Sequence, residues 1–313
     1  MMPVGEILAD WRREEFAFPE AAFRSAVAER NEIVPILLAE LERLAGDPRR
    51  LRDAGENRVA LFGLYLLAAF REPRTPAILY AILSRTGLEL HELWGDDMAA
   101  DAPRLFASWA ATAPGELYPF AENAAFSQDL RAAVLEAFVI QLLHGVGDPD
   151  VARRLLVRLG GRSLRREADG PDAALWHAWA RCCVDHGFAG LLPLVREAYA
   201  KRWIDPALST WNEEEEILER GREAVLERSR AEHGSLIDDA AAELRGWHRF
   251  GPEARREEEE RRRLAAKRAR IDAGDGLNLF RHADTIAGGG KRRPNEPCPC
   301  GSGRKYKKCC GRG

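Results

Sequence analysis

Apolar residues recur through much of this chain with the period of an α-helix. Val34, Leu37, Leu38, Leu41 and Leu44 are spaced by three and four residues, which places them on one helical face. A second set has two adjacent apolar stripes, typical of a helix packed on two sides: Val134, Leu135, Phe138, Val139, Leu142 and Leu143. No stretch alternates apolar and polar residues over six positions with Val, Ile or Thr enrichment. The sequence therefore predicts an all-α fold.

Pairs of apolar helices joined by short turns recur along the chain. Three copies begin at Leu61, Leu135 and Leu175, at separations of 74 and 40 residues. Two helices per unit and a period of about 40 residues are typical of HEAT-like or armadillo-like arrays. We expect a helical-repeat array over residues 1–250, with an irregular helical bundle as the alternative.

Several residues mark where helices should begin and end. Thr75-Pro76, Asp148-Pro149 and Asp205-Pro206 each place a capping oxygen before a proline. Proline loses no hydrogen bond at the first helical position, because an N–H there has no helical acceptor. Glycines suit helix ends and turns at four positions, Gly46, Gly87, Gly160 and Gly187.

The small net charge conceals two parts of opposite sign. The 313 residues include 47 Lys and Arg against 50 Asp and Glu, a net of −3. Residues 255–313 hold 17 basic and 8 acidic side chains, a net of +9, so the rest of the chain carries −12. The longest apolar stretch, Leu61–Phe70, is too short to cross a bilayer, and no secretory signal is visible at the start. We therefore expect a cytoplasmic protein with an acidic body and a basic tail.

Residues 251–293 have the composition of a charged linker. Glu and Arg dominate residues 253–270, which is typical of a solvated helix or a disordered segment. The following stretch contains Gly288, Gly289 and Gly290 and resembles a flexible tether in composition. We expect this linker to join the body to a very small C-terminal unit, residues 294–313.

Four of the six cysteines lie in the last 16 residues. Cys298, Cys300, Cys309 and Cys310 follow the spacing Cys-x-Cys, eight residues, Cys-Cys. Four thiolates can close a tetrahedral Zn²⁺ site with bonds of about 2.3 Å, and such a closed site is structural. Metal binding can also supply the folding free energy that so short a segment lacks. Disulfide pairing and an unstructured cysteine-rich end are the alternatives, and adjacent ligands are unexpected because consecutive side chains usually diverge.

This cysteine pattern resembles the SEC-C motif, the zinc-binding tail of the bacterial preprotein translocase motor SecA, which also ends many unrelated bacterial proteins. The resemblance covers residues 295–311 and matches all four cysteine positions. It implies that both adjacent cysteines bind Zn²⁺. In SecA the tail contacts the chaperone SecB and the ribosome, largely through basic residues. No phosphate-binding loop of the form Gly-x4-Gly-Lys-Ser/Thr occurs in this sequence, so the resemblance does not extend to the motor.

Three segments of the body carry a second, less specific resemblance. They are Phe-Arg-Glu-Pro-Arg at 70–74, Trp-His-Ala-Trp at 176–179 and Ala-Leu-Ser-Thr-Trp at 207–211. They resemble a bacterial domain family of unknown function whose members often end in a SEC-C motif. The resemblance implies a helical architecture and no assigned activity.

Basic residues flank the four cysteines. The candidates for partner binding are Lys291, Arg292, Arg293, Arg304, Lys305, Tyr306, Lys307 and Lys308. A small rigid unit with basic rims can dock on phosphate or on an acidic protein face, and Tyr306 can stack on a base. Alternatively, these residues only keep the unit soluble and offset the thiolate charge. We expect a protein partner, such as a chaperone, the ribosome or another acidic surface, with nucleic acid as an alternative.

The body offers weaker candidates. Cys182 and His186 are one helical turn apart, which would allow a Cys/His nucleophilic pair, but Cys182 and Cys183 more often are small buried hydrophobes. We expect Glu213–Glu216 to form a solvated helix start, favoured by the helix dipole. The sequence thus favours a non-enzymatic zinc-binding adaptor. An enzyme with a Cys/His site, or a nucleic-acid binder acting through the tail, is the alternative.

Overall fold

A computed structural model describes residues 2–13, 18–163, 173–270, 293–298 and 300–312, and the chain divides into two units after Gly251. Within the described residues, the only β-pairing is an isolated antiparallel bridge between Pro297 and Lys305. All other regular structure is helical, so the predicted all-α fold is confirmed. No helix in these described ranges is long and apolar enough to span a membrane.

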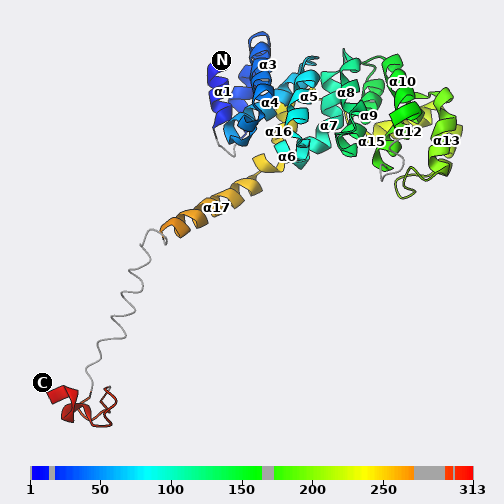
Figure 1. The fold of residues 1–313 in the computed structure, drawn as a ribbon. Coiled ribbons are helices and arrows are strands. Elements are labelled where there is room, and N and C mark those ends of the chain that lie inside the picture. The colour runs from blue at the N-terminus through cyan, green and yellow to red at the C-terminus, as the bar shows by residue number, and fades with distance from the viewer. Residues whose placement is uncertain (1, 14–17, 164–172, 271–292, 299, 313) are drawn as a thin grey trace. The chain divides into compact units, whose positions relative to one another are not determined.

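The first unit, Met1–Gly251, is a succession of short and medium helices that follow one another from α1 to α13 along its length (Figure 1). Its α-helices are α1 (Val4–Arg12), α2 (Glu20–Ala28), α3 (Arg30–Gly46), α4 (Ala54–Ala69), α5 (Thr75–Thr86), α6 (Leu90–Trp94), α7 (Asp96–Trp109), α8 (Tyr118–Glu122), α9 (Gln128–Leu143), α10 (Pro149–Arg158), α12 (Ala173–His186), α13 (Leu192–Ala200), α14 (Trp211–Glu219), α15 (Arg222–Glu232) and α16 (Ala240–Arg245). Short 3-10 helices and one π-helix join them: η1 (Pro48–Arg52), η2 (Pro114–Leu117), η3 (Leu159–Ser163), η4 (Ala189–Leu191) and η5 (His248–Phe250).

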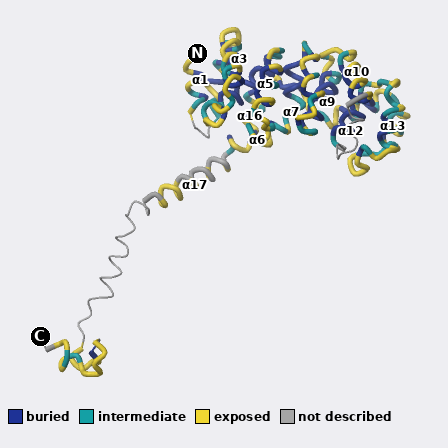
Figure 2. Tube along the Cα trace, in the orientation of Figure 1, coloured by how far each residue is buried: buried dark blue, intermediate teal, exposed yellow. Residues whose placement is uncertain are grey.

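Four of these helices form the buried centre of the unit. Helix α4 packs on α7, α7 packs on α9, and α9 packs on α12. Buried residues, dark blue in Figure 2, run through the middle of this unit. All residues from Val59 to Ala68 are buried, so α4 packs against other parts of the unit on every side. Helix α9 is buried almost as completely, which agrees with its two predicted stripes. The core therefore follows this row of central helices.

The three predicted helical pairs are present as α4 with α5, α9 with α10, and α12 with α13. Their packing is less regular than their spacing, because α5 packs mainly against α3, whereas α10 and α13 contact the helix that precedes them. Helical pairs are thus confirmed, and their assignment to the HEAT or armadillo type stays a prediction.

Residues 235–250 run back across the first unit and pack against its earlier helices. The ring of Phe250 lies 5.7 Å from that of Phe62, and the ring of Trp247 lies 5.4 Å from that of Tyr65, centroid to centroid. The backbone N–H of Ile237 donates to Ser108 Oγ at 2.8 Å. This returning segment therefore joins α4 and α7 to the end of the unit through contacts that span more than 120 residues of sequence.

The expected helix boundaries are partly right. Asp148 caps α10, accepting from Asp150 N, and Gly87 ends α5 with a φ of 63°. Helix α5, however, begins at Thr75 itself, and the Thr75 hydroxyl is buried without a hydrogen-bond partner in the described structure. Asp205 opens a turn, accepting from Ala207 N at 2.9 Å, and no helix begins before Trp211.

Gly160 is a second correction, because it lies inside π-helix η3 rather than at a helix end. A Cβ at this position would lie 2.7 Å from Cζ2 of Trp179 and 2.8 Å from Cδ2 of Leu194. Glycine therefore permits close packing of η3 against α12 and α13 here.

The second unit, Pro252–Gly313, begins with the charged helix α17 (Pro252–Arg270). It ends in the short helices η7 (Tyr306–Lys308) and η8 (Cys310–Arg312). The predicted glycine tether, Gly288–Gly290, lies outside the described residues.

Candidate metal centre

The C-terminal residues form a tight hairpin that brings the two cysteine pairs together. Cys298 N donates to Arg304 O at 2.7 Å, and Tyr306 N donates to Glu296 O at 2.8 Å. The turn between these contacts holds Gly301 and Gly303 at φ values of 75° and 67°, a region that favours glycine. The hairpin therefore explains why a Gly-Ser-Gly sequence separates the two halves of the cysteine pattern.

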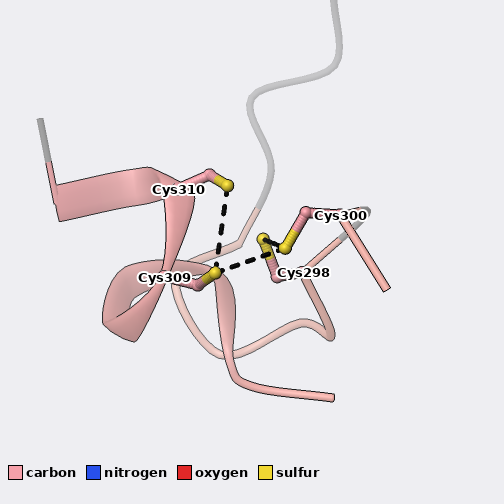
Figure 3. A group of neighbouring side chains, drawn as sticks. All are labelled: Cys298, Cys300, Cys309 and Cys310. Atoms are coloured by element: carbon pink, nitrogen blue, oxygen red, sulfur yellow. Dashed lines mark hydrogen bonds between the residues drawn. The ribbon is translucent and has the colours of Figure 1, made fainter. Parts of the chain in front are cut away.

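The four predicted ligands converge on one point (Figure 3). Their Sγ atoms all lie within 4.8 Å of one another. The Sγ of Cys300 is 3.4 Å from that of Cys298 and 3.3 Å from that of Cys309, and Cys309 and Cys310 are 3.8 Å apart. A tetrahedral zinc site with bonds of about 2.3 Å has sulfur–sulfur edges of about 3.8 Å, so this arrangement fits a four-thiolate site.

The side chains of Cys309 and Cys310 can both face the cluster because the backbone changes conformation sharply at Cys309. Cys309 has φ −134° and ψ −111° and separates η7 from η8. These angles are neither helical nor extended, so the usual divergence of consecutive side chains does not apply here. Cys298 is buried, Cys309 is half-buried, and Cys300 and Cys310 are exposed.

Crowding of the four thiols separates their pKa values. Hydrogen bonds with Ser302 and Cys309 lower the pKa of Cys300 to about 6. Hydrogen bonds with Cys298 and Cys300 raise the pKa of Cys310 to about 12. The pKa of Cys298 is also lowered and that of Cys309 is raised, so hydrogen bonding within the cluster favours the thiolate at two positions and the thiol at the other two. A divalent cation at the centre would stabilise all four sulfurs as thiolates.

Ser302, which lies in the turn between the two cysteine pairs, also belongs to the site. Its Oγ lies 3.1 Å from the Sγ of Cys300 and 3.2 Å from the Sγ of Cys309. A hydroxyl at this place can donate to a thiolate and orient it. The signal that could have identified it is a hydroxyl side chain in a glycine turn, two residues after a candidate ligand.

The predicted partner-binding residues differ in how the structure places them. Arg293, Arg304, Lys305, Lys307 and Lys308 are exposed around the cysteine cluster. Tyr306 is half-buried, and a Cβ at Gly311 would lie 2.9 Å from its Cδ1, so the ring packs against the Gly311 backbone. Lys291 and Arg292 lie outside the described residues.

The cysteines of the body are buried, as expected for hydrophobic packing. Burial raises the pKa values of Cys182 and Cys183 and lowers that of His186 to about 4. The Nδ1 of His186 is 2.9 Å from the backbone oxygen of Cys182 and 3.6 Å from its Sγ. These shifts favour a neutral thiol and a neutral imidazole over the charged pair of a cysteine nucleophile.

The predicted helix start at Glu213–Glu216 is present in α14, but one of its residues is not in solvent. Glu213 is exposed and caps α14 through Thr210, but its neighbour Glu214 is buried. The carboxylate of Glu214 accepts from Arg228 at 2.9 Å, and Arg228 also contacts the buried Asp185 at 3.2 Å. The burial of Glu214 is stabilised by this cross-helix ion pair. Within the described ranges, the C-terminal cysteines remain the only group of His, Cys, Asp and Glu side chains close enough to hold a metal ion.

Comparison with known proteins agrees with both resemblances. A family model described as "Protein of unknown function (DUF1186)" matches residues 2–251, and the SEC-C motif model matches residues 295–312. An uncharacterized protein of Chlamydia muridarum is 24% identical over 248 residues, covering 79% of this chain and 97% of that protein. A second uncharacterized protein, from Chlamydia trachomatis serovar D, is 22% identical over 253 residues, covering 79% and 96%.

The tail is similar to a short part of a much longer protein. Protein translocase subunit SecA of Pelotomaculum thermopropionicum is 94% identical over 18 residues, which are 6% of this chain and 2% of that SecA. No solved structure matches the chain. The SEC-C match and the cluster of four cysteines together are consistent with metal binding.

Proposed function

Since this chain belongs to the DUF1186 family of proteins of unknown function and ends in a SEC-C motif, we propose that it is a zinc-binding adaptor. Its C-terminal unit would hold Zn²⁺ through Cys298, Cys300, Cys309 and Cys310 and dock on an acidic partner. The observation that carries the proposal is the convergence of four sulfur atoms within 4.8 Å.

Zinc is the metal that this donor set favours. Four thiolates in a tetrahedral arrangement suit Zn²⁺, whereas hard cations such as Mg²⁺ and Ca²⁺ prefer oxygen ligands. Four protein ligands leave no position for a reacting water, so the ion would be structural. Its role would be to hold the hairpin and the two short helices η7 and η8 in one shape.

The exposed basic side chains support the docking role. Arg304, Lys305, Lys307 and Lys308 lie on the turn and on η7, beside the cluster. Glu296 is the single acidic residue of the last 23. A zinc ion with four thiolates carries a charge of about −2, which these side chains exceed. The net positive rim suits an acidic surface such as that of a chaperone or the ribosome.

The body would then act in binding rather than in catalysis. Supporting this are the burial of Cys182 and Cys183 and the hydrogen bond between His186 and the Cys182 carbonyl. Thiol labelling of the native protein tests this part. Slow labelling of both cysteines is expected, and rapid labelling of Cys182 near neutral pH would instead support an enzyme with a Cys/His site.

Affinity capture from cell extract tests the adaptor role. The intact protein is compared with a variant lacking residues 291–313 and with one carrying Arg304→Gln, Lys305→Gln, Lys307→Gln and Lys308→Gln. Partners should be lost from both variants, and raised salt should weaken their capture because the contact is electrostatic. Identical partners for all three proteins would refute docking through the tail. If nuclease treatment of the extract abolishes capture of the partners, the tail would bind nucleic acid rather than a protein.

A further inference from the structure

A cavity of about 330 Å³ lies where the end of α13 meets the start of α14 in the first unit. Its charged, hydroxyl-bearing and indole side chains are Arg196, Tyr199, Arg202, Ser209, Thr210 and Trp211. None of the described residues that line it is acidic. This is unusual for a body whose net charge is −12, because carboxylates outnumber basic residues elsewhere on it.

No carboxylate among the described residues engages either arginine of this cavity. Arg196 lies over the ring of Trp211, with its Cζ 5.6 Å from the ring centroid, and forms no ion pair with a described residue. The same holds for Arg202 among the side chains that the structure describes. The nearby Glu213 is turned toward the start of α14, where its Oε2 accepts from Thr210 N at 2.7 Å. Both guanidinium groups are therefore available to an anion from outside the chain.

The backbone of Arg202 adds a second, independent observation. Arg202 has a φ of 56° and follows α13 in a turn where Trp203 N donates to Ala198 O at 3.0 Å. This is the position of a helix end that normally holds glycine, because a side chain there is strained. A strained residue at a cavity is a reason to look for a function that requires its side chain.

Arg71 occupies the equivalent position after α4, and the contacts of its side chain explain why an arginine is present there. Its φ is 58°, and Glu72 N donates to Leu67 O at 3.0 Å in the same type of turn. The Arg71 guanidinium, however, pairs with Asp238 and donates to Ile237 O at 2.5 Å, which fixes the returning segment. At Arg71 the strain is therefore offset by an internal contact, and at Arg202 the corresponding contact is absent from the described structure.

The remaining lining residues limit the kind of ligand. Trp211, Ile204 and Pro206 give the cavity an apolar wall, and Tyr199 and Ser209 hydrogen-bond to each other at 2.8 Å between their hydroxyl oxygens. Two guanidinium groups bind a carboxylate or phosphate, and an aromatic wall favours a flat apolar group. We propose that this cavity binds a small organic anion, in which a carboxylate or phosphate contacts Arg196 and Arg202 and a flat apolar part lies against Trp211.

Calorimetric titration of the full-length protein with phenyl phosphate and with benzoate tests this proposal. At least one of the two should bind with one site per chain, and Arg202→Gly should weaken that binding by about tenfold or more, since a charge-assisted hydrogen bond is lost. The thermal midpoint of Arg202→Gly should not fall, because glycine suits this backbone. Failure of both probes to bind the intact protein, or equal affinity in Arg202→Gly, would overturn the proposal.

Arg71→Gly is the matched control, since it changes the same residue type at the same kind of turn. It should lower the thermal midpoint, because an ion pair is lost, and leave the affinity for the probe unchanged. Inorganic phosphate is the second control and should bind more weakly than phenyl phosphate. Equal affinities for these two phosphates would refute the role of the apolar wall.

Discussion

Arg104 on α7 donates two hydrogen bonds to the carboxylate of Glu243 on α16, from Nη1 to Oε2 at 2.8 Å and from Nη2 to Oε1 at 2.5 Å. Both side chains are about three-quarters or more buried, and Arg104 Nε also donates to Ser235 O at 2.8 Å. These contacts span up to 139 residues and hold the returning segment against the central helices.

Replacing Glu243 by Ala should loosen the returning segment. The substitution removes a two-point ion pair and leaves Arg104 with Asp101 as its remaining carboxylate contact. We expect the free energy of unfolding of the first unit to fall by about 2 kcal/mol. The urea unfolding transition of this unit measures the change. The exposed Glu227 on α15, replaced by Ala, should change it by less than about 0.5 kcal/mol. Equal effects of the two substitutions would contradict the structural role of the pair.

Gly160 and Gly161 form a matched pair for testing the packing of η3. A Cβ on Gly160 would press into Trp179 and Leu194, whereas a Cβ on Gly161 meets no heavy atom within 4 Å. Gly160→Ala should therefore destabilise the body by about 1–3 kcal/mol, as overpacking does. Gly161→Ala should have little effect on the same thermal or urea unfolding curve. If both substitutions lower the stability equally, the effect would come from the backbone and not from the contact of residue 160 with Trp179.

Buried histidine makes stability depend on pH. Burial lowers the pKa of His186 to about 4, while the pKa of an unfolded histidine is about 6.5. The unfolded chain therefore takes up a proton first as the pH falls, so stability is full above about pH 6.5 and is lost toward pH 4, by up to about 3 kcal/mol. His177 and His233 are shifted in the same direction by burial.

Urea unfolding of the intact protein and of His186→Gln at about pH 7 and about pH 5 checks this expectation. The variant should show the smaller loss between the two conditions. Parallel losses in both proteins would mean that His186 does not contribute to the pH dependence.

Local patterns in the sequence were sufficient for the helices with a clear apolar period, such as α3 and α9, but long-range contacts were not visible in it. The spacing of Val34, Leu37 and Leu41 predicts α3 because neighbours on one helix face are three or four residues apart. The return of residues 235–250 depends on contacts such as that of Arg104 with Glu243, which no local pattern encodes. The burial of Glu214 cannot be predicted from the sequence for the same reason, since its partner Arg228 lies on another helix, α15.

The cysteine cluster was predictable because its ligands are close in sequence, and resemblance to the SEC-C motif supplied the adjacent pair. Two features could not be predicted from the sequence. One is the backbone conformation at Cys309, and the other is the position of the Ser302 hydroxyl between the sulfurs of Cys300 and Cys309. Similarly, Asp205 fulfils the local rule for a cap, yet the chain continues as a turn until Trp211.

Ser302 should tune metal affinity without being a ligand. Its hydroxyl lies within 3.2 Å of the sulfurs of Cys300 and Cys309, and loss of such an outer hydrogen bond typically weakens metal binding by about 10–100-fold. We expect Ser302→Ala to release zinc to a competing chelator at a lower chelator concentration than the unmodified protein. Ser302→Thr keeps the hydroxyl and should behave like the unmodified protein. Equal release by all three proteins would exclude this role.

Metal content after purification without added metal, measured by elemental analysis, decides whether the four cysteines form a zinc site. The intact protein should contain one equivalent of zinc per chain, and Cys309→Ser should contain far less. The control Cys183→Ala, which changes a buried cysteine of the body, should retain the zinc. Absence of zinc from the intact protein, or an unchanged content in Cys309→Ser, would contradict a four-thiolate zinc centre.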